Sequence, residues 1–598
     1  MAGVCAAIEC AREGTRVALI NSRPMLGGNA SSEIRVHISG ADQSLKQPEY
    51  AESGLLYELM LENKARNEQF SYSIWDMILF EATQKEKNLT CFHNTVMYDC
   101  ETEGNRITSV LCVQETTEMR FRISGKIFVD ATGNGTLGYY AGAGFRMGSE
   151  ARAQTGEPDA PDEPNHDTMG NTIMFKARDM GHPVKFTPPA FANRYTEYDL
   201  RYRMHCSNQT LDFSGAKDPA ENRRTGGCSA RGIDYGYFWI ELMGDGVSDI
   251  IPQYEGIRDN LLAVLYGVWD HIKNGGDHLA DNYALEWVGI LPGTRESRRL
   301  EADYMLTEND ILENRIFDDA VAYGGWCIDV HTPGGMLDTD RLPSGDCVYF
   351  HGVYTIPYRS YCSRDISNMF MAGRDIGCTR LAYSSTRILG CCGVGGQAVG
   401  AAASMCVKKN LLPRELQPFI GELQQTLLKH DAFIPGFASD GRGDLVRSAA
   451  ITASSSAQGC PPEKITDGIG RTLGDDMHAW KSCGIAPEGE RLSVRFADAS
   501  DVNEIRLTFE TNFSYPIRVT MSRNRQIQQR DGIAPEIVRD YDIVLRCGGE
   551  TVKTLEIRGN YQRLNVIPVG GLRCDGFDVI VRATNGLGDA IIHEVRAY

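Results

Sequence analysis

The feature that most constrains the fold is the first twenty residues, where a run of small residues precedes a short apolar segment. Residues 1–14 are rich in Ala, Gly, Val and Cys and end at Gly14, which predicts a closely packed helix. Residues 15–20 predict a buried strand. A small-residue helix followed by a short parallel strand is the second half of a dinucleotide-binding βαβ unit. Gly3 fits the third glycine of its phosphate loop, so we expect the natural chain to begin upstream of Met1, with the first strand and two more glycines.

Length and charge exclude several classes of protein. At about 150 residues per domain, 598 residues predict three or four domains. The net charge of −18 argues against a nucleic-acid partner, because such proteins need a basic face to displace counterions. No apolar run reaches the ~20 residues of a membrane-spanning helix. The 18 cysteines form no C-x-x-C pair, so we expect neither a metal site nor an iron–sulfur cluster. Unpatterned cysteines favour a reducing compartment, and hence a cytoplasmic protein.

Three further segments extend the dinucleotide-binding pattern. Residues 23–33 read Arg-Pro-Met-Leu-Gly-Gly-Asn-Ala-Ser-Ser-Glu, in which the paired glycines permit close backbone approach to a ligand. Residues 126–135 predict an apolar strand that ends in Ala-Thr-Gly. Residues 368–375 predict another strand, followed by Gly-Arg-Asp, and the glycine-rich stretch 390–403 comes after it. Each segment alone is a weak signal, but their order and spacing are those of a dinucleotide domain interrupted by an insertion.

Residues 1–440 resemble the FAD-dependent oxidoreductase family, whose flavin domain also occurs in heterodisulfide reductase flavin subunits. The closest resemblance is to bacterial members found beside polysaccharide-degrading enzymes, through the blocks 237–241, 266–274, 292–299, 325–331 and 354–359. The absent iron–sulfur cysteines argue against a heterodisulfide-type electron relay, and Asn21 replaces the usual ribose-binding acid. The resemblance implies FAD as the cofactor. Its predicted contacts are Gly3, Asn21, Arg23, Gly27, Gly28, Ser31, Ser32, Val96, Ala131, Thr132, Gly133, Gly373, Arg374, Asp375, Arg387, Gly393, Gly395, Gly396 and Gln397.

The expected fold class is α/β: a Rossmann-like, doubly wound FAD-binding domain with an inserted α+β substrate domain, followed by an all-β sandwich. We assign 1–150 and 325–440 to the FAD-binding domain, 151–324 to the insertion and 449–598 to the sandwich. Residues 151–170 are acidic and proline-rich and predict an exposed loop, whereas 255–275 predict a helix. Short alternating strands after residue 490 suggest a β-sandwich. Together with Ile465-Thr466-Asp467-Gly468 and His478-Ala479-Trp480 before them, they resemble discoidin-like, galactose-binding-type sandwiches.

Alcohol oxidation by a flavin requires a base near the substrate, and a neutral histidine suits this task near pH 7. The candidates are His331, His37 and His351, with His331 first because it ends a predicted strand beside Asp329. Arg295 and Arg359 are candidates for anchoring a carboxylate or sugar hydroxyls. For each of these residues a purely structural role is an alternative.

Three functions remain open at this stage. The leading one is an FAD-dependent oxidoreductase that transfers a hydride between a hydroxylated small molecule, a carbohydrate, and flavin N5, with its electron acceptor unknown. The second is a flavin-assisted enzyme that cleaves glycosides through a keto intermediate. The third is a flavin-free carbohydrate-binding protein.

Overall fold

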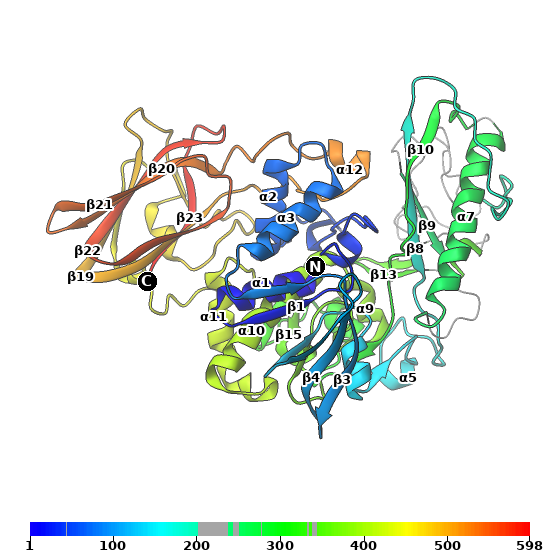
Figure 1. The fold of residues 1–598 in the computed structure, drawn as a ribbon. Helices are drawn as coiled ribbons and strands as arrows, with labels where there is room; N and C mark the ends of the chain where they lie inside the picture. The colour runs from blue at the N-terminus through cyan, green and yellow to red at the C-terminus, as the bar shows by residue number, and fades with distance from the viewer. Residues whose placement is uncertain (44, 201–236, 243–249, 277, 332–333, 338–343) are drawn as a thin grey trace. The chain divides into compact units, whose positions relative to one another are not determined.

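The computed structural model describes residues 1–43, 45–200, 237–242, 250–276, 278–331, 334–337 and 344–598. The chain forms two compact units, whose elements are labelled in Figure 1. The first unit comprises Met1–Lys46, Phe70–Ile420 and Arg518–Ile527. The second comprises Gln47–Gln69, Gly421–Ile517 and Gln528–Tyr598. The units therefore differ from the expected domains in three places, because 47–69 and 421–440 lie in the second unit and 518–527 lie in the first.

The first unit is built around the predicted helix and strand at its start. Helix α1 (Ala2–Arg12) ends before Gly14, and β1 (Val17–Ile20) pairs in parallel with β2 (Leu89–Phe92). Helix α10 (Leu389–Lys409) packs against α1 at very short range. A Cβ atom on Gly396 would lie 2.3 Å from the Ala2 carbonyl oxygen, so this contact needs glycine.

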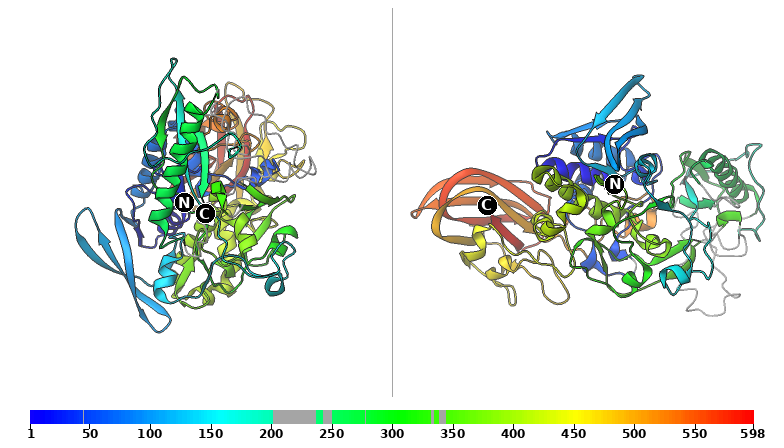
Figure 2. Two further views of the ribbon diagram at one scale, coloured as in Figure 1. Left: turned by 90° about the vertical axis from the view of Figure 1, so that its right-hand side faces the viewer. Right: turned by 90° about the horizontal axis from the view of Figure 1, so that it is seen from below.

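A second parallel pair joins segments far apart in sequence. Strand β6 (Phe128–Asp130) pairs with β16 (Met369–Met371). Asn368 fixes the start of β16, because its Nδ2 donates to the carbonyl oxygens of Ile107 (2.8 Å) and Lys126 (3.1 Å). The long antiparallel strands β3 (Thr95–Glu103), β4 (Arg106–Gln114) and β5 (Met119–Ser124) project from this part of the unit, as the blue strands in Figure 2 show.

The insertion contains an antiparallel sheet covered by one long helix. Strand β8 (Asn171–Asp179) lies between β9 (Tyr237–Leu242) and β10 (Tyr283–Val288). Helix α7 (Tyr254–Asn274) packs along this sheet (Figure 1), with the rings of Phe175 and Trp269 at 5.3 Å between centroids. The periodic apolar side chains of 255–275 are buried here, which confirms the predicted helix.

The remaining elements of the first unit are α3 (Tyr72–Gln84), α4 (Thr136–Ala141), β7 (Phe145–Arg146), α5 (Arg152–Thr155), β11 (Arg299–Leu300), α8 (Glu308–Leu312), β12 (Ala320–Gly324), β13 (Ile328–His331), β14 (Ser344–Val348), β15 (Tyr354–Pro357), α9 (Arg380–Thr386) and α12 (Arg523–Ile527). Residues 151–170 are largely irregular, and Asp162, Glu163 and Pro164 are exposed as predicted. Glu157 in this segment is buried, and its carboxylate accepts hydrogen bonds from the Glu308 amide (2.7 Å) and from Thr379 Oγ1 (2.5 Å).

The second unit is dominated by a seven-stranded antiparallel arrangement that fits the expected β-sandwich. Its longest strands, β19 (Glu490–Phe509) and β22 (Leu564–Thr584), carry register shifts and are longer than the short strands that the sequence predicts. Trp480, Tyr541 and Phe577 are fully buried in its core. The other elements are α2 (Leu55–Arg66), α11 (Ile420–Lys429), β17 (Ala450–Ala453), β18 (Trp480–Lys481), β20 (Val538–Cys547), β21 (Glu550–Ile557) and β23 (Ile591–Ala597).

Among the described helices, only α10 has the length and apolar composition of a membrane span. The apolar window of α10 is 94% buried inside the protein, as expected for a core helix packed on α1.

Candidate active site

A cavity of about 320 Å³ in the first unit gathers most of the predicted motifs. The glycine pair, the Ala-Thr-Gly turn and the Gly-Arg segment after β16 all line it. His37, Arg295 and His331 line the same cavity. The predicted cofactor residues in its lining are Gly27, Gly28, Ala131, Thr132, Gly133, Gly373, Arg374 and Arg387.

Backbone conformation explains why glycines form this wall. Gly27 and Gly28 have φ angles of 97° and 59°, in the left-handed region that glycine adopts without strain. At Gly133 a Cβ atom would lie 2.6 Å from Arg374 Nη2. Glycine is therefore required in both loops, which brings the backbone close to whatever fills the cavity.

Asp130 shapes the turn that follows β6. Its buried carboxylate accepts hydrogen bonds from the Thr132 amide (3.0 Å), Thr132 Oγ1 (2.7 Å) and the Gly138 amide (2.9 Å). These bonds hold the Ala-Thr-Gly turn and the start of α4 together. The turn presents Ala131, Thr132 and Gly133 to the cavity.

The surroundings of Asp375 and Arg374 indicate whether this site suits FAD. Asp375 is fully buried, and neither carboxylate oxygen accepts a hydrogen bond from another residue in the described part of the chain. Burial, and then the neighbouring Asp130 carboxylate, raise the pKa of Asp375 well above its usual range. Arg374 Nη1 is also buried without a partner among the described residues. Arg374 lines the cavity, and a buried donor of this kind normally binds something, so a cofactor with phosphate groups supplies the partner that Nη1 lacks. These residues fit FAD.

The helix α1 adds to this fit. Its first turn lies at the cavity, where Met1 and Ala2 form part of the wall. The amino end of a helix carries a partial positive charge and unbonded amide groups, which favour a phosphate. Gly3 does not line the cavity, and a Cβ atom there would meet Ala131 Cβ at 3.1 Å. It therefore serves the close packing expected of the third glycine.

On the other side of the cavity an Asp–His pair lies between two arginines. His331 Nε2 is 3.2 Å from Asp329 Oδ2 and 3.3 Å from Arg295 Nη1. Arg387 Nη2 donates to Asp329 Oδ2 (3.0 Å), and Cys347 Sγ donates to Oδ1 (3.1 Å). Although burial opposes ionisation, His331 and Arg387 hold the pKa of Asp329 far below its usual range. Asp329 is thus a permanent anion beside His331.

His37 has the opposite electrostatic surroundings. Burial is the main cause that lowers its pKa well below the usual value, and the cations Arg525, Arg518 and Arg295 lower it further. Arg525 lines the cavity with Ser522, and its Nη1 donates to Gln43 Oε1 (2.5 Å). Arg518 pairs with Asp42. His37 is therefore a neutral imidazole at pH 7.

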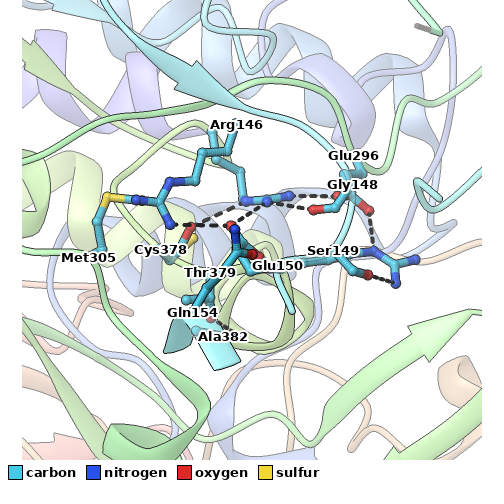
Figure 3. A network of polar contacts seen from close by, with 12 residues as sticks. Arg146, Gly148, Ser149, Glu150, Gln154, Glu296, Met305, Cys378, Thr379 and Ala382 are labelled. Atoms are coloured by element: carbon cyan, nitrogen blue, oxygen red, sulfur yellow. Dashed lines mark hydrogen bonds and ion pairs between the residues drawn. The ribbon is translucent and has the colours of Figure 1, made fainter. Parts of the chain in front are cut away.

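A buried network of ions anchors the segment that carries Arg295 (Figure 3). Arg299 is completely buried and donates to Glu296 Oε1 (2.8 Å) and Glu150 Oε1 (2.9 Å). Arg380 reaches Glu296 Oε2 (3.4 Å) and Ser149 Oγ (2.8 Å). The network joins residues 146–150, 295–300 and 378–382, and it fixes Arg295 at the cavity wall.

Several predicted site residues lie outside the cavity lining. Arg23 pairs with Glu33, while Arg359 pairs with Asp319 (2.9 Å). His351 is exposed, and its carbonyl oxygen accepts a hydrogen bond from Asn314 Nδ2 (2.7 Å). The others outside the lining are Gly3, Asn21, Ser31, Ser32, Val96, Asp375, Gly393, Gly395, Gly396 and Gln397.

Ser32 and the glycines of α10 have evident structural roles. The Ser32 amide donates to Asp76 Oδ1 (3.1 Å), which ties the glycine loop to α3. Helix α10 begins at Leu389, earlier than the glycine-rich pattern suggests. Ile388, Leu389 and Cys392 therefore reach the cavity, whereas Gly395 and Gly396 lie in the helix and pack against Tyr361 and Ala2.

The sequence analysis missed Arg525 and Ser522. Both come from the long connection between β19 and β20, which we expected to belong wholly to the sandwich. The signal was the stretch Ser-Arg-Asn-Arg-Gln at 522–526, which interrupts a region of alternating strands.

The family comparison agrees with this geometry. A family model described as FAD dependent oxidoreductase matches residues 1–427. The chain belongs to this family. As an FAD-dependent oxidoreductase it uses FAD as its cofactor, and the glycine loops and Arg374 line a cavity suited to hold it. The search of curated proteins finds no match.

Solved structures resemble about a quarter of the chain. A fucose-binding module from Streptococcus pneumoniae, SpX-3, is 12% identical, with 26% of this chain and 96% of that chain covered and a TM-score of 0.21. The family 32 module of NanJ from C. perfringens, solved with galactose, is 18% identical, with 26% and 96% covered and a TM-score of 0.19. The family 32 module of EndoD from Streptococcus pneumoniae is 16% identical, with 26% and 98% covered and a TM-score of 0.21.

Proposed function

We propose that this enzyme oxidises a hydroxyl group of a small polyhydroxylated compound, a carbohydrate, in the cavity beside His331. FAD supplies the hydride acceptor, its N5 atom. The side chains of this chain bind the substrate, orient its carbon and take up one proton.

The observation that carries the proposal is a pair of buried donors beside the Asp–His pair. Trp326 Nε1 and Arg387 Nε are both buried and have no partner among the described residues, and both side chains line the cavity. A ligand rich in oxygen acceptors satisfies such donors, whereas an apolar ligand leaves them unpaired at a cost of about 1–3 kcal/mol each. Trp326 also offers an aromatic face of the kind that packs against a sugar ring.

His331 is our candidate for the proton acceptor. In its neutral form Nε2 accepts from Arg295 Nη1, and once protonated Nε2–H donates to Asp329 Oδ2. The same nitrogen thus has a partner in both protonation states. The permanent negative charge of Asp329 stabilises the imidazolium, as the carboxylate of a catalytic triad does.

The experiment is anaerobic mixing of the FAD-loaded protein with a panel of sugars and sugar acids, followed by flavin absorbance. We expect at least one of these compounds to bleach the band near ~450 nm, a property of the cofactor. His331→Asn should slow bleaching by about 10²–10⁴-fold, the range for loss of a general base, with FAD content unchanged. The matched control is His351→Asn, an exposed histidine outside the cavity. Equal effects of the two variants would contradict the assignment of His331.

The second candidate, glycoside cleavage through a keto intermediate, uses the same cavity and the same base. It predicts release of the leaving group from an aryl glycoside without an external electron acceptor. An oxidase or dehydrogenase instead requires an acceptor for each turnover.

A further inference from the structure

A cluster of two histidines and one glutamate lies in the inserted domain, and none of the three lines the cavity. His271 is in the last turn of α7, His278 follows that helix, and Glu197 lies on the segment before it. His271 Nε2 is 3.3 Å from Glu197 Oε1, and His278 Nε2 contacts the same oxygen. The side chains of both histidines are 3% exposed, whereas that of Glu197 is 62% exposed. The cluster therefore has a buried floor and an opening to solvent.

The other nitrogen of each ring fixes the tautomer. His271 Nδ1 lies 3.0 Å from the Tyr195 carbonyl oxygen, and His278 Nδ1 lies 3.2 Å from the Ile272 carbonyl oxygen. A carbonyl oxygen only accepts, so both rings carry their proton on Nδ1 and turn the lone pair of Nε2 toward Glu197. Two lone pairs and a carboxylate repel one another unless a cation lies between them.

The protein scaffold holds the two rings in place. A Cβ atom on Gly275 would lie 2.5 Å from His271 Nδ1, so glycine is needed where the chain passes the ring. Lys273 Nζ donates to the carbonyl oxygens of Ala280, Asp281 and Tyr283 at 2.7–2.8 Å, which fixes the segment after His278. Backbone carbonyls that orient the distal nitrogen of a histidine are the usual second layer around a metal ion. The carboxyl end of α7 adds a partial negative charge, which favours a cation.

We propose that Glu197, His271 and His278 bind a divalent transition-metal ion, Zn²⁺. Two imidazole nitrogens and one carboxylate oxygen form a ligand set that binds zinc in preference to magnesium or calcium. With metal–ligand distances of about 2.0–2.1 Å, donor atoms of a tetrahedral zinc site lie roughly 3.3 Å apart. The Nε2 of His271 and Oε1 of Glu197 have this separation. The ion links the segment that carries Glu197 to the end of α7, and its fourth position is open to water.

The test uses the full-length protein, purified after exposure to zinc and freed of loose metal on a desalting column. We expect about one zinc per chain by elemental analysis, and a Co²⁺ titration should give the intense visible bands of a tetrahedral site. His278→Gln should weaken metal binding at least ~100-fold and Glu197→Gln at least ~10-fold. The matched control is His182→Gln, an exposed histidine of the same domain, and it should bind as the wild type does.

Thermal unfolding gives an independent readout, because an ion that binds only the folded state raises the melting temperature. Zinc should raise it for the wild type and for His182→Gln, but not for His278→Gln. Because Glu197 is exposed, Glu197→Gln tests the site even where a histidine variant fails to fold. The proposal is overturned if the wild type retains no zinc or cobalt, or if Glu197→Gln and His278→Gln bind as tightly as His182→Gln. Neither result depends on the enzyme's substrate.

Discussion

The buried network around Arg299 offers a direct test of how the active-site segment is held. Arg299→Met removes a guanidinium that donates to Glu296 (2.8 Å), Glu150 (2.9 Å) and the carbonyl oxygens of Gly148 (2.7 Å) and Cys378 (3.2 Å). The variant keeps the volume but leaves two buried carboxylates without their main cation. Breaking a buried pair in this way costs about 3–5 kcal/mol.

The remaining donors put the expected loss at the lower end of that range. Glu150 still accepts from the Arg380 amide (3.0 Å), and Glu296 still accepts from the Met169 amide (2.8 Å). We therefore expect Arg299→Met to lower the free energy of unfolding of the first unit by about 3 kcal/mol near pH 8.

The loss should depend on pH in a defined direction. In the wild type burial raises the pKa of Glu150, but Arg299 and the Arg380 amide outweigh it, so the pKa lies below its usual value. Ionised Glu150 therefore stabilises the folded state. This stabilisation is present above the unfolded pKa of Glu150 and is lost as pH falls through its folded pKa. Without Arg299 the pKa of Glu150 rises above its unfolded value, so the penalty is full at neutral pH and fades as the carboxyl takes up a proton. The difference between variant and wild type should therefore shrink from pH 8 to pH 5.

The assay is guanidinium unfolding followed by release of flavin fluorescence, which reports on the first unit alone. The control Arg122→Met removes an exposed pair with Glu101 (2.7 Å) and should cost less than about 0.5 kcal/mol. Equal midpoints for Arg299→Met and Arg122→Met, or a deficit that grows toward pH 5, would refute the reasoning.

Three further changes probe the same unit. Burial raises the pKa of Glu308 to about 8. Glu308 therefore lowers the free energy of unfolding as pH rises above the unfolded pKa near 4.5, and this loss reaches its full size above pH 8. Glu308→Gln should thus stabilise the protein by about 1–3 kcal/mol at pH 8.5 and by nothing at pH 4, and a gain that is independent of pH would contradict this. Asp375→Ala removes the buried carboxylate next to Arg374 of the cavity wall and should raise the Kd for FAD by about 10–100-fold, measured as the FAD content after desalting. Unchanged FAD content would show that Asp375 does not contact the cofactor. Four arginines but only one acid line the cavity, so D-glucuronate should bind more tightly than D-glucose, and Arg525→Gln should remove about tenfold of that preference in titrations of the holoprotein. Arg525→Lys should retain part of it, and equal binding of both sugars to the wild type would argue against a carboxylated substrate.

Local sequence patterns account for the parts of the fold that could be predicted. The helix and strand at 1–20, the turn after β6 and the helix α7 each follow from a run of apolar or small residues that ends at a glycine or a polar residue. Such patterns depend on neighbours in sequence, so one sequence is enough to read them. His331 also follows from such a local pattern, because it ends a strand next to Asp329.

The parts that were missed depend on contacts between distant segments. Arg525 reaches the cavity from a connection between two sandwich strands, and no periodicity in 510–537 specifies that the segment joins the first unit. His271 and His278 approach Glu197 across more than seventy residues, and their spacing matches no common metal motif. Val96 and Gln397 were predicted to contact the cofactor but lie outside the cavity lining. Val96 pairs with β4, and Gln397 donates to Glu9.

The two histidines of the cavity also differ in a way that assigns their roles. A base must hold a proton after it has acted, and the surrounding charges decide whether it can. Around His37 the nearest charges are the cations Arg525, Arg518 and Arg295, which oppose protonation and hold its pKa low. Around His331 the ionised Asp329 lies 3.2 Å from Nε2 and offsets Arg295 on the same atom. His331 is therefore the residue that we propose as the proton acceptor, whereas the cationic surroundings of His37 favour a negatively charged part of the substrate. A substrate that carries a hydroxyl group at one end and a carboxylate at the other satisfies both sides of the cavity at once.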